Sequence, residues 1–554
     1  AILSMNLMIQ PNQICLIVKL YNNRPKLLPD SNETINLKGI LFMKTNTHIV
    51  PFFNKTADLK VGLNQLGLRN ASEALFTSLL PGLNNVSNRI RYYSFYCWLI
   101  GEFYKNRESF TDKEFYKYIR YSEYLLALIH SRGQGVDGIP GITYALSTRS
   151  QGGSNFDLQA GTYNSQGDTK SETYWANAGG VLRQYYSSSL KDIAILKENN
   201  EKSSILNISK EDDLVSGSML ADGFAKNVGE DGPKFLKIIQ RGNVSAEELN
   251  SLESSFNMRK FPQKSNEKEL IIELLLQKDY PASESKFSYR KATIYHYLKH
   301  FSQNGTKESF TKYMYDEFLN GHSDDDCVLG WYRYYLNDNW QYQTSVIFVA
   351  LLNQLSNKAD WQEVSSDAEE LALSIINNIG AKYKDGTLKE ICACIDKNDI
   401  ASKPQRGNLD TEAAPALVNL LMMYNTNKDV RSKRPDYREA FPSAVNSDFY
   451  SFMDEIDKSL ETNFYEWLKD YILKKIIFCH YQVALRKYLQ TGIASQKFIY
   501  ENGMIRFLNG SEATHTGPRT DTLYDFVSDL ELVDDNGITD KGILLLNKLK
   551  DAEA

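Results

Sequence analysis

From Ala71 to about residue 490, apolar residues recur at the three- and four-residue spacing of amphipathic helices. Such helices bury one apolar face, so they must pack against further elements to be stable. With 554 residues, 42% hydrophobic and 24% charged, the chain has a globular composition but exceeds one ordinary core. The period therefore predicts a mainly α, multi-domain body.

Local signals place several helix ends. Residues 111–114 (Thr-Asp-Lys-Glu) and 245–248 (Ser-Ala-Glu-Glu) are capping boxes, in which the first side chain and the Glu satisfy each other's backbone N–H groups. Ser87 is expected to cap a helix over 88–104. These signals predict a helical domain over 43–190 and further helical domains over 191–490.

A glycine-rich stretch interrupts the first of these domains at 131–180. It is too long for a simple connection, so it is either a functional loop region or a flexible one. Tyr174 and Trp175 lie within it, and large aromatic residues are unusual in disordered segments. We expect the segment to be ordered by packing against the first helices.

The last 60 residues change period. Residues 497–508 alternate around Asn502-Gly503, the strongest short hairpin signal. A helix over 521–530, a tight turn at 535–537 and a helix over 541–548 follow. This order is typical of winged-helix modules, so a small α+β module is expected over 495–554.

The first residues differ from the rest of the chain. Residues 1–42 are rich in Asn, show no clear period and run directly into Met43. We interpret Met43 as the expected native start and 1–42 as upstream sequence.

Several function classes lack their motifs. No phosphate-binding loop, no G-x-S-x-G elbow and no H-E-x-x-H zinc motif occurs. Six cysteines are too few for a disulfide framework, and the pair Cys392 and Cys394 has no second pair at zinc-site spacing. No apolar run approaches the ~18 residues of a membrane span. We therefore expect a cytoplasmic protein with no membrane association, no cofactor and no bound metal.

Two patterns could nevertheless supply a metal site. His296 and His300 stand four residues apart, on one face of a predicted helix, and Asp324–Asp326 could add a ligand only through the fold. Glu284 and Lys286 form an E-x-K pair, but without the apolar strand that carries such a pair in nucleases. A solvated or packed helix face and an ordinary loop are the favoured interpretations.

Basic residues near aromatic ones are the other candidates, because phosphates bind cations and bases stack on rings. Arg89 and Arg91 precede a run of aromatic residues, and Arg519 precedes a helix start that would welcome a phosphate. The clearest basic loop contains Arg431, Lys433, Arg434 and Arg438. The alternatives are a structural core for the aromatic run and a solvated surface for the loop.

One set of motifs also suggests a family. Leu79-Leu-Pro-Gly82, Arg89-Ile-Arg-Tyr-Tyr93 and Trp98 follow one another. This order resembles the Leu-Phe-Pro-Gly, Arg-x-Arg-Tyr and Trp pattern of an uncharacterised family of bacterial proteins. Ser171-Glu-Thr-Tyr-Trp175 and Trp331-x-x-Tyr334 before 343–355 resemble later segments of that family, so the resemblance spans residues 60–355. It implies a place in defence or mobile-element gene clusters and brings no catalytic residue.

These observations favour a non-catalytic subunit of a bacterial defence or mobile-element system. Its partners would be DNA or proteins encoded by neighbouring genes. The first alternative is a metal-dependent nuclease with a site assembled from distant carboxylates. The second is a protein-interaction scaffold or sensor with an exposed aromatic patch around Tyr92, Tyr93 and Trp175.

Overall fold

The computed structural model covers the chain, and its described part runs from residue 64 to residue 553. The segment expected to precede a native start, 1–42, and the Glu284 and Lys286 pair lie outside the described residues. Within 64–553 the residues not described are 106, 108, 133–136, 164–172, 201–202, 211–213, 278–288, 359, 397–411 and 440–447.

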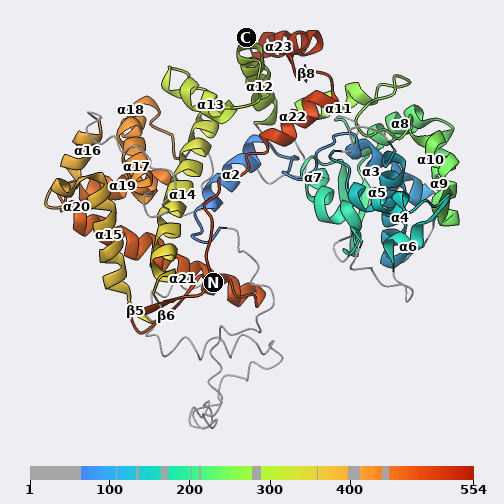
Figure 1. Ribbon diagram of the computed structural model, residues 1–554. Helices are drawn as coiled ribbons and strands as arrows, with labels where there is room; N and C mark the ends of the chain where they lie inside the picture. The colour runs from blue at the N-terminus through green and yellow to red at the C-terminus, as the bar shows by residue number, and fades with distance from the viewer. Residues whose placement is uncertain are drawn as a thin grey trace, which may run out of the picture. The chain divides into compact units, whose positions relative to one another are not determined.

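Helices make up 64% of the structure and strands 7%, which confirms the expectation of a mainly α protein (Figure 1). The chain forms two compact units. Unit 1 contains the described part of 1–71 together with 336–432 and 444–515. Unit 2 contains 72–335, 433–443 and 516–554. The division follows contacts and not chain order, and the domain boundaries expected at 190 and 490 stay predictions.

Unit 2 holds the aromatic-rich part of the chain. Its helices are α3 (Tyr92–Lys105), α4 (Asp112–His130), α5 (Ile142–Ser150), α6 (Leu158–Thr162), the π-helix η2 (Leu182–Tyr186), α7 (Ser187–Asp192), α8 (Gly217–Val228), α9 (Asp231–Arg241), α10 (Ala246–Leu252), α11 (Glu267–Leu276), α12 (Arg290–Asn304), α13 (Phe310–Leu319), α22 (Thr520–Asp529) and α23 (Asp540–Glu553). Its strands form three short antiparallel pairs, β1 (Asn155–Asp157) with β4 (Asn243–Ser245), β2 (Leu196–Asn200) with β3 (Ser203–Ile208), and β8 (Val533–Asp534) with β9 (Gly537–Ile538).

The central helix of unit 2 is α3. Its sequence is apolar on nearly all sides, so it is buried throughout and packs on α8, where the rings of Trp98 and Phe224 lie 5.2 Å apart. It begins at Tyr92 and not at residue 88, and Ser87 does not cap it. The Ser87 hydroxyl is buried without a hydrogen-bond partner in the described part of the chain. Both expected capping boxes, at 111–114 and 245–248, are confirmed.

The described part of the glycine-rich stretch is ordered around Glu123 of α4. This buried carboxylate accepts hydrogen bonds from the Tyr96 hydroxyl, the Trp175 indole and the backbone N–H groups of Val181 and Leu182, at 2.7–3.0 Å. A side chain at Gly180 would meet the carboxylate, because its Cβ would lie 2.4 Å from Oε2 and the backbone φ is +67°. Packing onto the first helices is thus what orders this segment, as expected.

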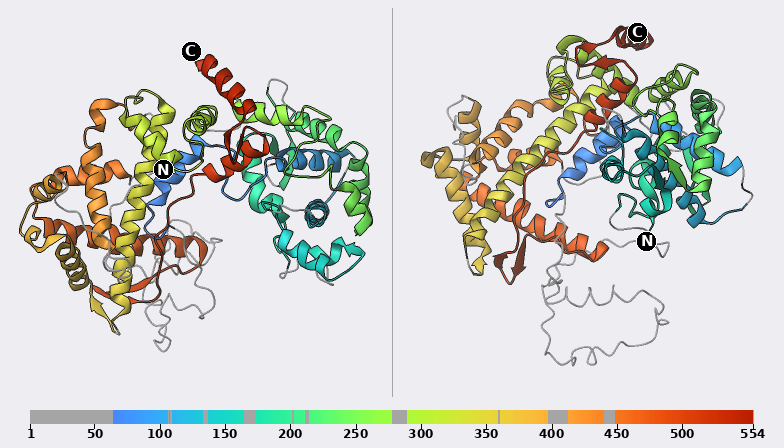
Figure 2. Two further views of the ribbon diagram at one scale, coloured as in Figure 1. Left: turned by 45° about the horizontal axis from the view of Figure 1, so that its top comes forward. Right: turned by 45° about the vertical axis from the view of Figure 1, so that its right-hand side comes forward.

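Unit 1 is built along the long helix α14 (Asp326–Ser356), which begins in unit 2 and continues without a break (Figures 1 and 2). The apolar segment expected as a helix over 343–355 is only its last part. The further helices are α15 (Val364–Gly380), the 3-10 helix η3 (Ala381–Tyr383), α16 (Leu388–Asp396), α17 (Ala413–Asn427), α18 (Val430–Lys433), α19 (Phe449–Ser459), α20 (Phe464–Tyr471), the π-helix η5 (Ile472–Phe478) and α21 (Cys479–Thr491). Helix α2 (Arg69–Leu79) begins in unit 1 and ends in unit 2.

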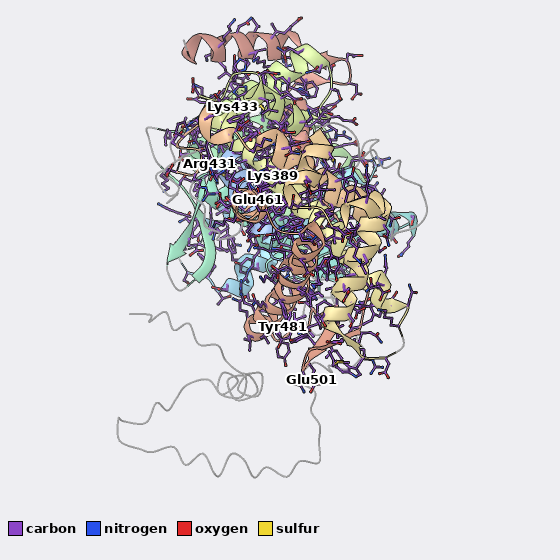
Figure 3. All side chains as sticks on the ribbon, turned by 90° about the vertical axis from the view of Figure 1, so that its left-hand side faces the viewer. Lys389, Arg431, Lys433, Glu461, Tyr481 and Glu501 are labelled. Atoms are coloured by element: carbon purple, nitrogen blue, oxygen red, sulfur yellow. The ribbon has the colours of Figure 1, made fainter. Side chains whose placement is uncertain are left out.

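A three-stranded sheet in the order β5-β7-β6 closes one end of unit 1, beside α21 (Figure 1). Its strands are β5 (Gln362–Glu363), β6 (Phe498–Glu501) and β7 (Met504–Phe507). The expected hairpin is confirmed. Asn502 and Gly503 take φ values of 51° and 78°, as a two-residue primed turn requires. Tyr481 of α21 packs on Tyr500 with ring centroids 5.2 Å apart, and Tyr481 and Glu501 lie at this end in Figure 3.

The last 60 residues belong to both units. The hairpin β6–β7 completes a sheet with β5 in unit 1, whereas α22 packs in unit 2, where Phe526 meets Tyr93 at a centroid distance of 5.5 Å. The second tight turn is confirmed by the pairing of Asp534 with Gly537. None of the described helices combines the length and apolar character that crossing a membrane requires.

The Glu123 cluster gives a first prediction. Glu123→Gln replaces one accepting oxygen by an NH₂ group that must face an N–H donor, so the folded state should lose about 1–3 kcal/mol. Glu198→Gln, at an exposed ion pair with Lys191, is the matched control and should change stability little. Urea unfolding of both variants measures the difference. Equal stability of the two would show that the Glu123 hydrogen bonds do not hold the segment.

Candidate functional site

The two arginines before the aromatic run lie inside unit 2. Arg91 is fully buried and donates to the Glu267 carboxylate at 3.2 Å and to the backbone oxygens of Ser255, Asn257 and Lys260. Arg89 is 5% exposed and pairs with Asp529 at 3.0 Å. Both guanidinium groups serve the core, so the structure does not offer them to a nucleic acid. The structural interpretation of this run is the one that fits.

Two further candidates are also engaged by the protein. Arg434 is buried between Asp326 and Asp436, and these carboxylates raise its pKa. Arg519 donates to the Leu80 carbonyl at 2.9 Å and covers the Phe76 ring, and burial lowers its pKa. Neither side chain points to solvent as a phosphate contact needs.

The remaining basic residues lie at the surface. Arg431 is exposed and forms ion pairs with Asp454 and Asp457 (Figure 3). Arg438 is exposed and donates to the Tyr437 hydroxyl at 2.9 Å. Lys433 is exposed and forms no ion pair with any residue that the structure describes. The expected basic loop is therefore divided between the units and is largely neutralised by carboxylates.

Two other sequence-based candidates change as well. His300 does not share a site with His296, because its ring nitrogens contact the Glu308 carbonyl and the Asn304 side chain. Tyr92, Tyr93 and Trp175 are buried, so the exposed aromatic patch expected of a scaffold does not exist at these residues.

Unit 1 contains a polar cavity of about 580 Å³ that no sequence motif marks. Four chain segments that are far apart in the sequence form it. They are the segment before α2, the middle of α14, the residue before β6 and the loop after β7. Its lining residues are Asn64, Gln65, Leu66, Leu68, Arg69, Gln341, Ser345, Lys497, Asn509, Gly510, Ser511, Glu512 and Thr514.

Helix α21 fixes the first wall. Three consecutive carbonyls, those of residues 64–66, accept hydrogen bonds from the side chains of Lys487, His480 and Cys479. The His480 ring also accepts the backbone N–H of Lys497 at Nε2, at 2.9 Å. Because one partner is a carbonyl and the other an N–H group, the ring must be neutral with its proton on Nδ1. This single histidine therefore joins two walls of the cavity.

Helix α14 fixes the opposite wall. The Gln341 amide donates to the Thr514 carbonyl at 2.9 Å, and Asp338 accepts from the His515 ring at 2.8 Å. The His515 ring in turn stacks on Tyr342 with centroids 4.0 Å apart. The loop after β7 is thereby held against the helix, which keeps the cavity in one shape.

Two cations line this cavity. Lys497 is only 3% exposed, and its ammonium forms neither a hydrogen bond nor an ion pair with any described residue. Burial lowers the pKa of this ammonium, since a desolvated charge without a partner is costly. Arg69 donates to the Thr514 hydroxyl and to the carbonyls of Thr514 and His515, but to no carboxylate among the described residues.

The rest of the lining agrees with a binding role. Glu512 is the one carboxylate among the lining residues, so cations exceed acids. The Ser511 hydroxyl is buried without a hydrogen-bond partner in the described part of the chain. The lining set contains neither histidine nor cysteine, the usual base and nucleophile of covalent catalysis. The arrangement can accept a negatively charged group and hold it by charge and hydrogen bonds.

The comparisons with known proteins add no family. No protein-family model matches the sequence, and neither a curated protein nor a solved structure is significantly similar to it. The resemblance to a bacterial defence-cluster family stays a prediction.

His480 gives a prediction on pH. Burial lowers its pKa from 6.5 to about 4, so the unfolded chain binds the proton more readily than the folded one between these values. Stability from His480 is complete above the unfolded pKa and is lost as the pH falls towards 4. Between pH about 7 and pH about 5 the loss should be about 2 kcal/mol.

Urea unfolding followed by tryptophan fluorescence at the two pH values tests this expectation. In His480→Gln the loss should be smaller by that amount, while His130, whose pKa burial also lowers to about 4, stays as an internal reference. An unchanged loss in the variant would show that His480 is not held neutral.

Proposed function

We propose that this protein binds a phosphate-bearing ligand in the cavity of unit 1 and acts as a binding protein rather than as a catalyst. The observation that carries the proposal is the buried ammonium of Lys497 beside Arg69, neither of them paired with a carboxylate among the described residues. An anion in the cavity would supply the missing partner and offset the cost of desolvating the lysine.

The size of the cavity favours one nucleotide-sized group. Ligand sites of about 300–1,000 Å³ hold small molecules, and about 580 Å³ falls within that range. The amides of Asn64, Gln65 and Gln341 could contact a sugar or a base, while Lys497 and Arg69 contact the phosphate. A terminal nucleotide of a nucleic-acid strand is the ligand that we prefer.

Two features from the sequence support the nucleic-acid class. The order α22, β8–β9, α23 follows the helix, turn and helix arrangement expected of a winged-helix module. The motifs at 79–98 and 171–175 resemble a family of defence or mobile-element gene clusters. The proposal is therefore a non-catalytic DNA-binding or partner-binding subunit of such a system, acting in the cytoplasm.

Lys497→Met tests the proposal, because methionine has a similar length and apolar character but no charge. The variant should remain folded and should bind a 5′-phosphorylated single-stranded oligonucleotide roughly 10- to 100-fold more weakly, as loss of a charge-assisted hydrogen bond implies. Lys433→Met, at an exposed lysine of unit 2, is the matched control and should bind as the unchanged protein does. Fluorescence anisotropy at two salt concentrations measures both, with weaker binding at high salt.

Four ligands separate the sources of the phosphate, namely the oligonucleotide with and without its 5′-phosphate, a mononucleotide and inorganic phosphate. Preference for the phosphorylated oligonucleotide supports a strand end, and equal binding of the mononucleotide supports a free nucleotide. If Lys497→Met binds all four like the unchanged protein, the cavity is not the site. If the unchanged protein binds none, a protein partner becomes the favoured ligand.

A further inference from the structure

A second group of polar side chains lies in unit 2, away from any residue of the cavity in sequence. His296 of α12, Asp325 just before α14 and Cys327 in its first turn each offer one ligand atom, and these atoms lie within 4.8 Å of one another. The sequence suggested His300 as the partner of His296, but the fold supplies Asp325 and Cys327 instead. Among the described residues this is the group whose geometry could hold a metal ion.

The carboxylate of Asp325 is held in place from two sides. Its Oδ1 accepts the backbone N–H groups of Cys327 and Val328, at 2.7 and 3.2 Å, and so caps α14. Its Oδ2 lies 2.9 Å from Nε2 of His296. These contacts fix the positions of two of the three ligand atoms before any ion binds.

The sulfur is also positioned. Cys327 is 1% exposed, and its Sγ lies 3.5 Å from the Thr293 hydroxyl, which accepts the Trp331 indole N–H at 3.0 Å. Thr293 and His296 stand three residues apart on α12 and so share one face of the helix. Supporting hydrogen bonds of this kind orient ligands in metal sites.

His296 differs from the other buried histidines of the chain in one respect. His300 and His480 each use both ring nitrogens in hydrogen bonds. The Nδ1 atom of His296 is buried and has no hydrogen-bond partner in the described part of the chain. Its imidazole is therefore not fully satisfied by the protein, as a purely structural histidine would be.

We infer that His296, Asp325 and Cys327 bind a divalent transition-metal ion of the zinc class. One imidazole, one carboxylate and one thiolate suit Zn²⁺ or Co²⁺, whereas Mg²⁺ and Ca²⁺ prefer oxygen ligands alone. The thiol gives up its proton to solvent on binding, so that two anionic ligands neutralise the ion. The Asp325 side chain is 41% exposed, so water can reach the ion as a fourth ligand.

The neighbouring charge does not oppose this site. Arg434 is the nearby cation, and it forms ion pairs with Asp326 and Asp436. Asp326 is thereby engaged and is not one of the proposed ligands. The set contains a thiol and does not match the magnesium-binding carboxylates of the nuclease alternative.

The test uses the full chain, first treated with a chelator and then titrated with Co²⁺ or Zn²⁺. We expect one ion per chain at this site, a thiolate-to-cobalt charge-transfer band, and a zinc–sulfur distance of about 2.3 Å by X-ray absorption. Absence of bound metal in the unchanged protein would overturn the inference, as would a bound metal without sulfur coordination.

Matched variants assign the ligands. Cys327→Ser should abolish the charge-transfer band, and Asp325→Asn, which keeps the Oδ1 cap, should weaken binding at least roughly 100-fold, the upper range for loss of an outer partner. His300→Gln and Cys97→Ser are the controls and should bind metal unchanged. Thermal unfolding of the metal-free proteins shows whether each variant is folded.

If Cys327→Ser is folded and keeps the band, another cysteine holds the metal and the inference fails. Metal binding is read here without any anionic ligand, so its failure and the failure of phosphate binding are separate results.

Discussion

The ion pair between Arg91 and Glu267 is the interaction on which the core of unit 2 depends. Both side chains are fully buried, and Arg91 also donates to three backbone oxygens, while Glu267 accepts from Ser94 and Asn227. The pair joins α3, α8, α11 and the segment 255–260. A buried pair is tolerated only when its remaining donors and acceptors are satisfied, and loss of one partner costs about 3–5 kcal/mol.

The same rule separates structural groups from candidate sites throughout the molecule. Glu123 accepts four hydrogen bonds, and His480 uses both ring nitrogens, so both are explained by the fold. Lys497 and His296 are also buried, but the described residues leave the ammonium unpaired and one ring nitrogen without a partner. Buried polar groups that the protein does not satisfy are the places where a ligand lowers the free energy.

The two places differ in the ligand that they suit. The cavity combines an excess of cations with neutral amides and hydroxyls, which matches a phosphate and its attached nucleoside. The group in unit 2 combines a nitrogen, an oxygen and a sulfur ligand, which matches a borderline-soft metal ion. Within each unit, long hydrogen-bonded helices hold the ligand atoms, so neither site rests on an isolated loop.

The sequence by itself determined the local structure, because helix periods, capping boxes and the Asn502-Gly503 turn depend on residues close in the chain. It could not show that Arg91 is buried, since an arginine beside tyrosines looks alike in a core and on a binding face. It also could not find the cavity, whose two cations are 428 positions apart, from Arg69 to Lys497. Only tertiary structure decides which distant side chains meet and which buried charges remain without partners, and that decides where ligands bind.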